Sequence, residues 1–178
     1  DAVVAPRLFL AFRVPPAGDE AWYAASMLGA GLGMGAGSRL PHRLVREQQL
    51  ASDAGAYTFD LTKGSDLLIC DVTARPGVSA ERLEAAVVAE VDRLIAEGVT
   101  AEERERALAL LETSWVAGLQ SAGGGADKLS QFATYRGDPS LVNDEPARHA
   151  AVSLAAISAF APPRLGADNR PTLLYVPQ

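Results

Sequence analysis

A run of alternating glycines in the first third of the chain limits what that region can form. Glycine occupies every second position from Gly29 to Gly37. Because glycine loses more backbone freedom on folding than any other residue, neither a helix nor a strand is favoured by such a run. We therefore expect a turning or mobile loop between two helices. Ser38 is placed to cap the second helix, and Pro41 falls in its first turn, where a missing N–H costs little.

Hydrophobic periodicity predicts the other elements. Residues 7–14 alternate between two faces, which indicates a half-buried strand ended by two prolines. Further strands are expected over residues 51–61, 67–74 and 172–176, with a hairpin turn at 63–66. Helices are expected from residue 19 into the glycine run, from residue 38, between the capping and stopping signals at 79–98 and at 100–125, and over 126–135, 141–151 and 154–161. This order predicts one α+β domain over residues 1–178, with a mostly antiparallel sheet and helices packed on one face.

Composition and charge exclude several classes of function. The 178 residues suit one domain or one lobe of a larger protein, and the net charge of −6 without a basic stripe argues against nucleic acid as a partner. No apolar run approaches membrane-spanning length and none resembles a signal peptide, so we expect no membrane partner. The single cysteine excludes an internal disulfide and, with the alanine and arginine bias, favours a bacterial cytoplasm.

Side chains with catalytic or metal-binding chemistry are few. Neither His42 nor His149 stands in a His-x-x-Glu-His spacing or its inverse, so surface or helix-packing roles are favoured for both, and a zinc site assembled from distant residues stays an open alternative. Cys70 falls on the core face of its predicted strand and is interpreted as a core residue. The glycines superficially suggest a nucleotide loop, but they follow a helix, whereas the dinucleotide fingerprint follows a strand. The acidic cluster at 102–105 is interpreted as a solvated helix face.

Five segments occur in one order along the chain: the glycine run with residues 38–40, then residues 44–51, 74–79, 97–103 and 169–177. In this order they resemble the C-terminal lobe of the pitrilysin/insulinase-type zinc metallopeptidases, the superfamily that includes mitochondrial processing peptidase. The resemblance implies one of several similar α+β lobes around a closed chamber, with no zinc and no catalytic residue of its own. The zinc and the His-x-x-Glu-His motif are expected in a catalytic lobe, in the same chain or in a partner subunit.

The resemblance also implies where a peptide substrate would be contacted. In active members this type of lobe often supplies an Arg and, seven residues on, a Tyr that contact the substrate backbone. An ungapped alignment through residues 46–51 places Val45 and Ser52 there. Valine has no side-chain donor and serine is much shorter than tyrosine, so the sequence departs from the pattern. Arg46 or Tyr57 takes over such a role only if the local register differs.

The glycine run resembles a segment implicated in substrate recognition in processing-peptidase relatives, although a slack helix connector is an equal alternative. The candidate substrate-binding residues are Gly33, Gly35, Gly37, Ser38, Arg39 and Arg46. The leading hypothesis is a non-catalytic lobe of a zinc metalloendopeptidase that helps enclose and bind an extended peptide. The alternatives are a non-proteolytic scaffold or assembly protein of the same superfamily and, more distantly, a nucleotide-binding enzyme.

Overall fold

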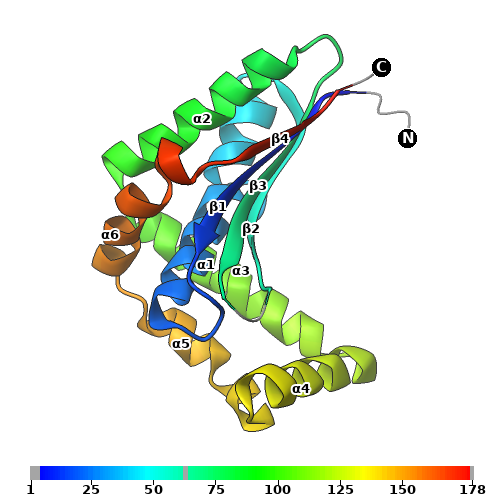
Figure 1. Cartoon of the computed structure of the whole chain (residues 1–178), viewed down its shortest axis with the longest axis vertical. Helices are drawn as coiled ribbons and strands as arrows, with labels where there is room; N and C mark the ends of the chain where they lie inside the picture. The colour runs from blue at the N-terminus through cyan, green and yellow to red at the C-terminus, as the bar shows by residue number, and fades with distance from the viewer. Residues whose placement is uncertain (1–4, 62–63, 177–178) are drawn as a thin grey trace.

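A computed structural model describes residues 5–61 and 64–176 of the chain (Figure 1). Its four strands form one antiparallel sheet in the order β2-β3-β1-β4. The strands are β1 (Arg7–Val14), β2 (Ala51–Phe59), β3 (Asp66–Ala74) and β4 (Thr172–Tyr175). The helices are α1 (Glu20–Gly33), η1 (Pro41–Glu47), α2 (Ala80–Glu97), α3 (Ala101–Leu119), α4 (Ala122–Arg136), η2 (Pro139–Asn143), α5 (Glu145–Ala151), α6 (Leu154–Arg164) and η3 (Ala167–Asn169). Helices cover one face of the sheet, which confirms the α+β prediction, and the molecule curves into a crescent with the strands toward its concave side (Figure 1).

The core lies between the sheet and the helices packed on it. Strict alternation in β1 and β3 buries every second side chain, as the sequence predicts: Leu8, Leu10, Phe12, Val14, Leu68, Cys70, Val72 and Ala74. Helix α1 packs against β2 and β3, and α2 packs against β1. Cys70 is fully buried, and this burial raises the pKa of its thiol to about 12. Its interpretation as a core residue is therefore confirmed.

The glycine run does not form a single loop. Helix α1 continues to Gly33, so Gly29 and Gly31 lie inside it and are buried. A Cβ atom on Gly33 would lie only 1.8 Å from the backbone nitrogen of Ala56 in β2. The glycine permits a close approach of helix to strand, which is a tertiary requirement and is not visible in local propensity. The loop prediction is therefore wrong for residues 29–33 and holds for the short connection that follows, where Gly35 has a φ of 81°.

The second helix also differs from its prediction in detail. Residues 41–47 are π-helical, and the N–H of Gln48 donates to the carbonyl of Arg43, five residues earlier, at 2.8 Å. The Ser38 hydroxyl does not cap this helix, because it donates backward to the carbonyl of Gly35 at 2.5 Å. Leu40 and Leu44 are fully buried.

Three predicted boundaries in the second half of the chain need correction. The glycines at 123–125 do not end α3; they form the first turn of α4, where the Ser121 hydroxyl accepts from the N–H of Gly124. The helix expected over 141–151 divides into η2 and α5. Pro162 and Pro163 do not stop α6, which continues to residue 164. The capping box at Thr100 is confirmed, and part of the predicted 63–66 turn lies outside the described residues.

Candidate functional site

A groove of about 450 Å³ lies between the end of α1, helix η1 and the edge strand β2. This groove is lined by five of the eight positions that were identified from the sequence. The groove residues are Gly33, Gly35, Ala36, Pro41, Val45, Arg46, Ser52, Asp53, Ala54 and Gly55. Val45 and Ser52 therefore both border this groove. We call this feature the β2 groove.

The β2 groove owes its shape to a tight connection between η1 and β2. Gln49 ends the π-helix with a φ of 54°, a left-handed conformation that is uncommon outside glycine. The N–H of Leu50 then donates to the carbonyl of Leu44 at 2.8 Å. Arg75 joins both sides, because its guanidinium donates to the carbonyls of Ala51 at 3.1 Å and Val45 at 3.4 Å. These contacts fix the wall of the groove opposite the edge strand.

The polar chemistry of the β2 groove suits binding. Arg46 and Asp53 are exposed and place one positive and one negative charge along it. The Ser52 hydroxyl donates toward the carbonyls of Thr73 at 3.3 Å and Ala74 at 3.4 Å, so it is directed at β3. The groove borders β2, which is an edge strand of the sheet, and an extended peptide can add to a sheet at such an edge.

The other predicted residues lie elsewhere. The Arg39 guanidinium binds the Glu103 carboxylate at 2.6 and 2.9 Å and donates to the carbonyl of Gly98 at 2.6 Å. Ser38 is buried and Gly37 lies beside α3 rather than in the groove. Glu103 is thus a paired, largely buried group, which corrects the interpretation of 102–105 as a wholly solvated face. Arg39 connects the start of the second helix to the α2–α3 turn.

Zinc does not fit the side chains of residues 5–61 and 64–176. Within those ranges no three His, Cys, Asp or Glu residues are grouped so that they could hold a metal ion. His42 is half-exposed, and its Nδ1 lies 3.4 Å from Oε1 of Glu47. His149 is buried, with Nδ1 2.9 Å from the carbonyl of Glu145 and Nε2 3.0 Å from the Ser26 hydroxyl. We therefore derive no chemical step through zinc in this chain.

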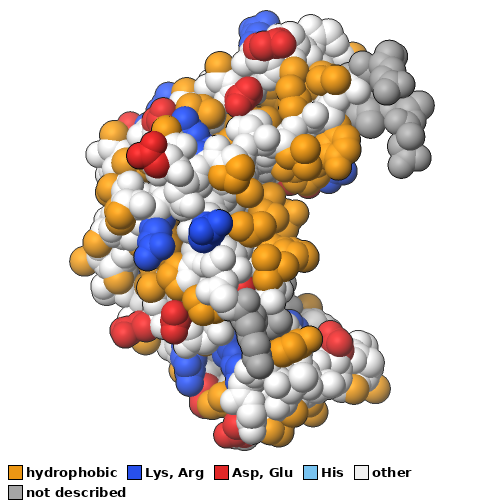
Figure 2. Space-filling view, in the orientation of Figure 1, with side chains coloured by type: hydrophobic (Ala, Val, Ile, Leu, Met, Phe, Trp, Pro, Cys, Tyr) orange, Lys and Arg blue, Asp and Glu red, His pale blue; other side chains and the backbone are white. Residues whose placement is uncertain are grey.

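The open face of the sheet carries a second feature, an apolar surface on the concave side of the crescent (Figure 2). Its exposed members are Tyr57, Phe59, Leu173 and Tyr175, and Phe9, Leu67 and Ile69 lie half-buried on the same face. The sequence groups Tyr57 and Phe59 on one face, and the structure shows that this face points away from the helices. Contiguous exposed apolar surface of this kind marks an interaction site. We call it the open sheet face.

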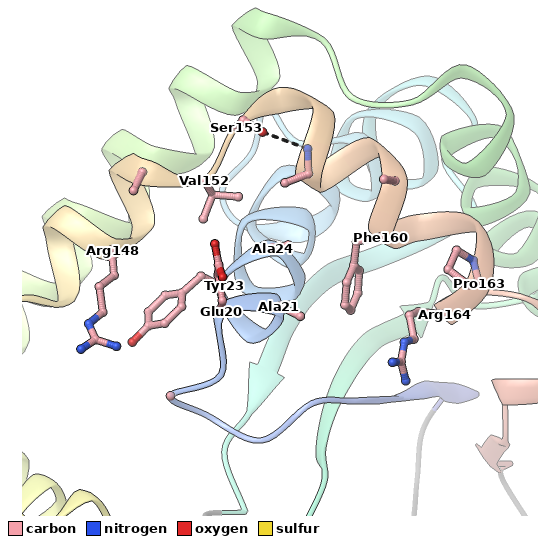
Figure 3. A pocket seen from close by; sticks show the side chains of 14 residues that line it. Glu20, Ala21, Tyr23, Ala24, Arg148, Val152, Ser153, Phe160, Pro163 and Arg164 are labelled. Atoms are coloured by element: carbon pink, nitrogen blue, oxygen red, sulfur yellow. Dashed lines mark hydrogen bonds between the residues drawn. The ribbon is translucent and has the colours of Figure 1, made fainter.

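A larger pocket of about 710 Å³ lies between α1, α5 and α6 (Figure 3). Arg148 and Arg164 stand at opposite ends of it, with Tyr23 and Phe160 between them (Figure 3). No local sequence pattern predicts this pocket, because its three walls come from segments far apart along the chain. Asp53 of the β2 groove was also not predicted, although its position directly after Ser52 in a predicted strand was an available signal.

The chain was compared with protein families and with curated proteins. A family model described as the peptidase M16 inactive domain matches residues 2–111. No curated protein matches the chain significantly. No helix in the described part of the chain is long and apolar enough to cross a membrane.

Solved structures share the fold at low sequence identity. A protease from Helicobacter pylori aligns with a TM-score of 0.87 and 20% identity over 99% of this chain and 42% of its own. The inactive peptidase domain of a candidate zinc protease from Bordetella parapertussis aligns with a TM-score of 0.86 and 23% sequence identity, over 100% of this chain and 97% of its own. A chain of complex III2 from Candida albicans aligns with a TM-score of 0.83 and 11% sequence identity, over 99% of this chain and 44% of its own. The chain thus spans less than half of the Helicobacter protease and almost all of the Bordetella domain.

Proposed function

The chain belongs to the family of M16 peptidase inactive domains, and from this premise we propose that it is the non-catalytic lobe of a zinc metalloendopeptidase, helping to enclose and bind an extended peptide. Hydrolysis takes place in a zinc-bearing lobe, in the same chain or in a partner subunit. Zinc there supplies the activated water. This lobe supplies binding surface.

The β2 groove is the observation that carries the proposal. It combines the outer edge of β2 with the two positions expected to contact a substrate, Val45 and Ser52. An extended peptide added to an edge strand gains main-chain hydrogen bonds, and alternate side chains reach the neighbouring surface. Arg46 is the cation of the groove and donates to a peptide carbonyl or carboxylate.

The open sheet face gives the lobe a place to dock. A sheet covered by helices on one side leaves apolar side chains of β1, β2, β3 and β4 on the other, and a catalytic lobe of similar construction covers them. The strands lie toward the concave side of the crescent (Figure 1), and in this proposal the enclosed space lies beside the edge of β2.

The test measures peptide cleavage by the native peptidase that contains this lobe, with a pool of quenched-fluorescence peptides. Replacing Arg46 by alanine is expected to lower kcat/KM about tenfold, the effect of losing one charged hydrogen bond worth roughly 1.4 kcal/mol. The matched control is Arg82→Ala, at an exposed position of α2 that does not line the groove, which should leave cleavage unchanged. Equal rates for the Arg46 variant and the native peptidase would exclude the groove as a binding site.

A gain-of-function variant tests the same proposal from the other side. Substituting both Val45→Arg and Ser52→Tyr restores the two side chains that active members of the superfamily often use. We expect a higher kcat/KM, because these side chains add donors along the bound peptide. Gln48→Arg adds the same charge to an exposed position that does not line the groove and serves as the control.

A scaffold or assembly role is the second candidate, favoured by Val45 and Ser52 themselves, since neither side chain replaces the donors that the family pattern places there. Under this alternative the native protein holds its partners together and cleaves no peptide. Peptide mapping of the material that co-purifies with the protein distinguishes the two, because only the peptidase requires a His-x-x-Glu-His motif in the same chain or a partner. The cytoplasmic location favoured by the single cysteine stays a prediction.

A further inference from the structure

A second cavity, separate from the β2 groove, lies between α1, α3 and α5 and has a volume of about 440 Å³. Its walls include Trp22 and Ser26 of α1, Leu111 and Trp115 of α3, and Pro146 and His149 of α5. None of the β2 groove residues lines it. The volume is within the range of small-molecule sites, and apolar walls with a few polar groups are typical of them.

One wall contains a hydrogen-bond donor that lacks an acceptor. The Trp22 side chain is nine-tenths buried, and among the described residues its Nε1 is the one buried side-chain nitrogen or oxygen without a partner. Native proteins pair almost all such groups, so an unpaired indole N–H in a cavity wall calls for an explanation. A ligand oxygen supplies the missing acceptor.

The neighbouring polar pair narrows the class of ligand. The Glu145 carbonyl can only accept, so the Nδ1 of His149 donates to it and the Nε2 is left to accept from the Ser26 hydroxyl. The Ser26 oxygen then keeps free lone pairs. Trp22 and Ser26 are four residues apart on α1 and so lie on the same side of the helix. Ser26 Oγ is thus an acceptor in a residue that lines the cavity, and Trp22, which lines the same cavity, has a buried donor that a turn of the indole would bring to a ligand.

The charges around the cavity favour a neutral ligand. Lys128 lies with its Nζ 5.2 Å from the centre of the Trp115 ring, and Asp60, Glu112 and Glu145 also line the walls. A carboxylate ligand meets these three acidic residues, and an ammonium ligand competes with Lys128 for the aromatic face. A carboxamide has the complementary pair, a carbonyl oxygen that accepts and an N–H that donates.

We propose that this cavity binds a small neutral carboxamide with an apolar or aromatic body. The amide oxygen accepts from Trp22 Nε1–H, the amide N–H donates to Ser26 Oγ, and the body packs on Leu111 and Trp115. Since Nε1 is inaccessible to water in the structure, the indole turns toward the arriving oxygen, and this movement gives the measurement its signal.

The test uses benzamide as the probe and the two indole N–H resonances of the ¹⁵N-labelled chain as the readout, since Trp22 and Trp115 are its two tryptophans. We expect a saturable downfield shift of the Trp22 indole proton. Trp115→Phe keeps an aromatic wall, leaves Trp22 as the single indole and should retain the response. Trp22→Phe should lose benzamide binding, measured through the fluorescence of Trp115.

Benzoate and protonated benzylamine, which match benzamide in size, are the charged controls and should produce no saturable shift. A response to benzylamine alone would overturn the proposal in favour of an aromatic–acidic cation site, and a response to benzoate would overturn the argument from charge. If benzamide produced no shift in the wild-type chain, the proposal would be overturned, and this result does not depend on whether any variant folds. The test does not measure peptide cleavage, so the result of the benzamide titration is independent of the proposed function.

Discussion

Gly33 is required by its neighbours rather than by its own backbone angles. Because a Cβ at this position would lie 1.8 Å from the backbone nitrogen of Ala56, Gly33→Ala must push α1 away from β2. We expect a loss of about 1–3 kcal/mol in the free energy of unfolding, the usual effect of overpacking. Urea denaturation measures it.

Gly31 provides the matched control within the same helix. A Cβ there meets nothing within 4 Å, and alanine is the better helix former by about 0.5–1 kcal/mol. Gly31→Ala should therefore stabilise the chain. If the two variants had equal stability, the close approach of α1 to β2 would not be what requires glycine.

The ion pair between Arg39 and Glu103 makes stability depend on pH. Burial by itself raises the pKa of the Glu103 carboxyl, but the hydrogen bonds from Arg39 and from the Thr100 backbone outweigh it and hold the pKa below its usual range. A carboxyl with a depressed folded-state pKa contributes stability above its unfolded pKa of about 4.3 and loses it as pH falls through the folded value.

Glu103→Gln should therefore lower the free energy of unfolding at pH 7 by about 1–3 kcal/mol, since it removes charged hydrogen bonds in a largely buried place. At pH 3 the difference from the wild type should shrink, because the carboxyl is becoming neutral in both states. Glu102→Gln, at a side chain 90% exposed, is the control. A difference that stays constant from pH 7 to pH 3 would rule out the ion pair as its source.

At the scale of elements, the turn between α3 and α4 depends on one glycine of three. A Cβ on Gly124 would lie 2.1 Å from the carbonyl oxygen of Gly118, whereas one on Gly123 meets nothing within 4 Å. Gly124→Ala should open the α3–α4 turn and destabilise the fold by about 1–3 kcal/mol. Gly123→Ala should stabilise α4. Hydrogen exchange of the α4 amides detects both effects locally, and equal protection in the two variants would contradict this account of the turn.

Strands were more predictable than the glycine-rich elements because their signal is local. The alternation in residues 7–14 and 67–74 contains the whole reason why β1 and β3 bury one face. Gly33 and Gly124 are instead required because backbone atoms of other segments lie close to them. No local preference reveals such contacts. The sequence therefore predicts loops where the structure has the end of one helix and the start of another.

The candidate site was predictable in part for the same reason. Val45, Arg46 and Ser52 are close in sequence, so a short connection brings them into one groove. Arg39 has the right chemistry for a substrate contact, but its partner Glu103 lies 64 residues away, and only the folded chain shows that its guanidinium is engaged. The cavity lined by Trp22, Trp115 and His149 is built from four helices and β2, and no local sequence pattern predicts it.

At the scale of the whole molecule, the proposed function gives the open sheet face different surroundings in the isolated chain and in a peptidase that contains it. Tyr57 is 43% exposed in the chain, so a charge there costs little in water. Under the proposed function the catalytic lobe covers this face, and an unpaired charge buried at such an interface costs on the order of 3 kcal/mol.

Tyr57→Glu should therefore leave the free energy of unfolding of the 178-residue chain within about 0.5 kcal/mol of the wild-type value. In the native peptidase the same substitution should lower the melting temperature by several degrees and reduce peptide cleavage, because the lobes separate. Val116→Glu, at a 55% exposed apolar position on α3, is the control and should affect neither measurement. Equal behaviour of Tyr57→Glu in the chain and in the native peptidase would mean that the open sheet face is not the surface on which the catalytic lobe docks.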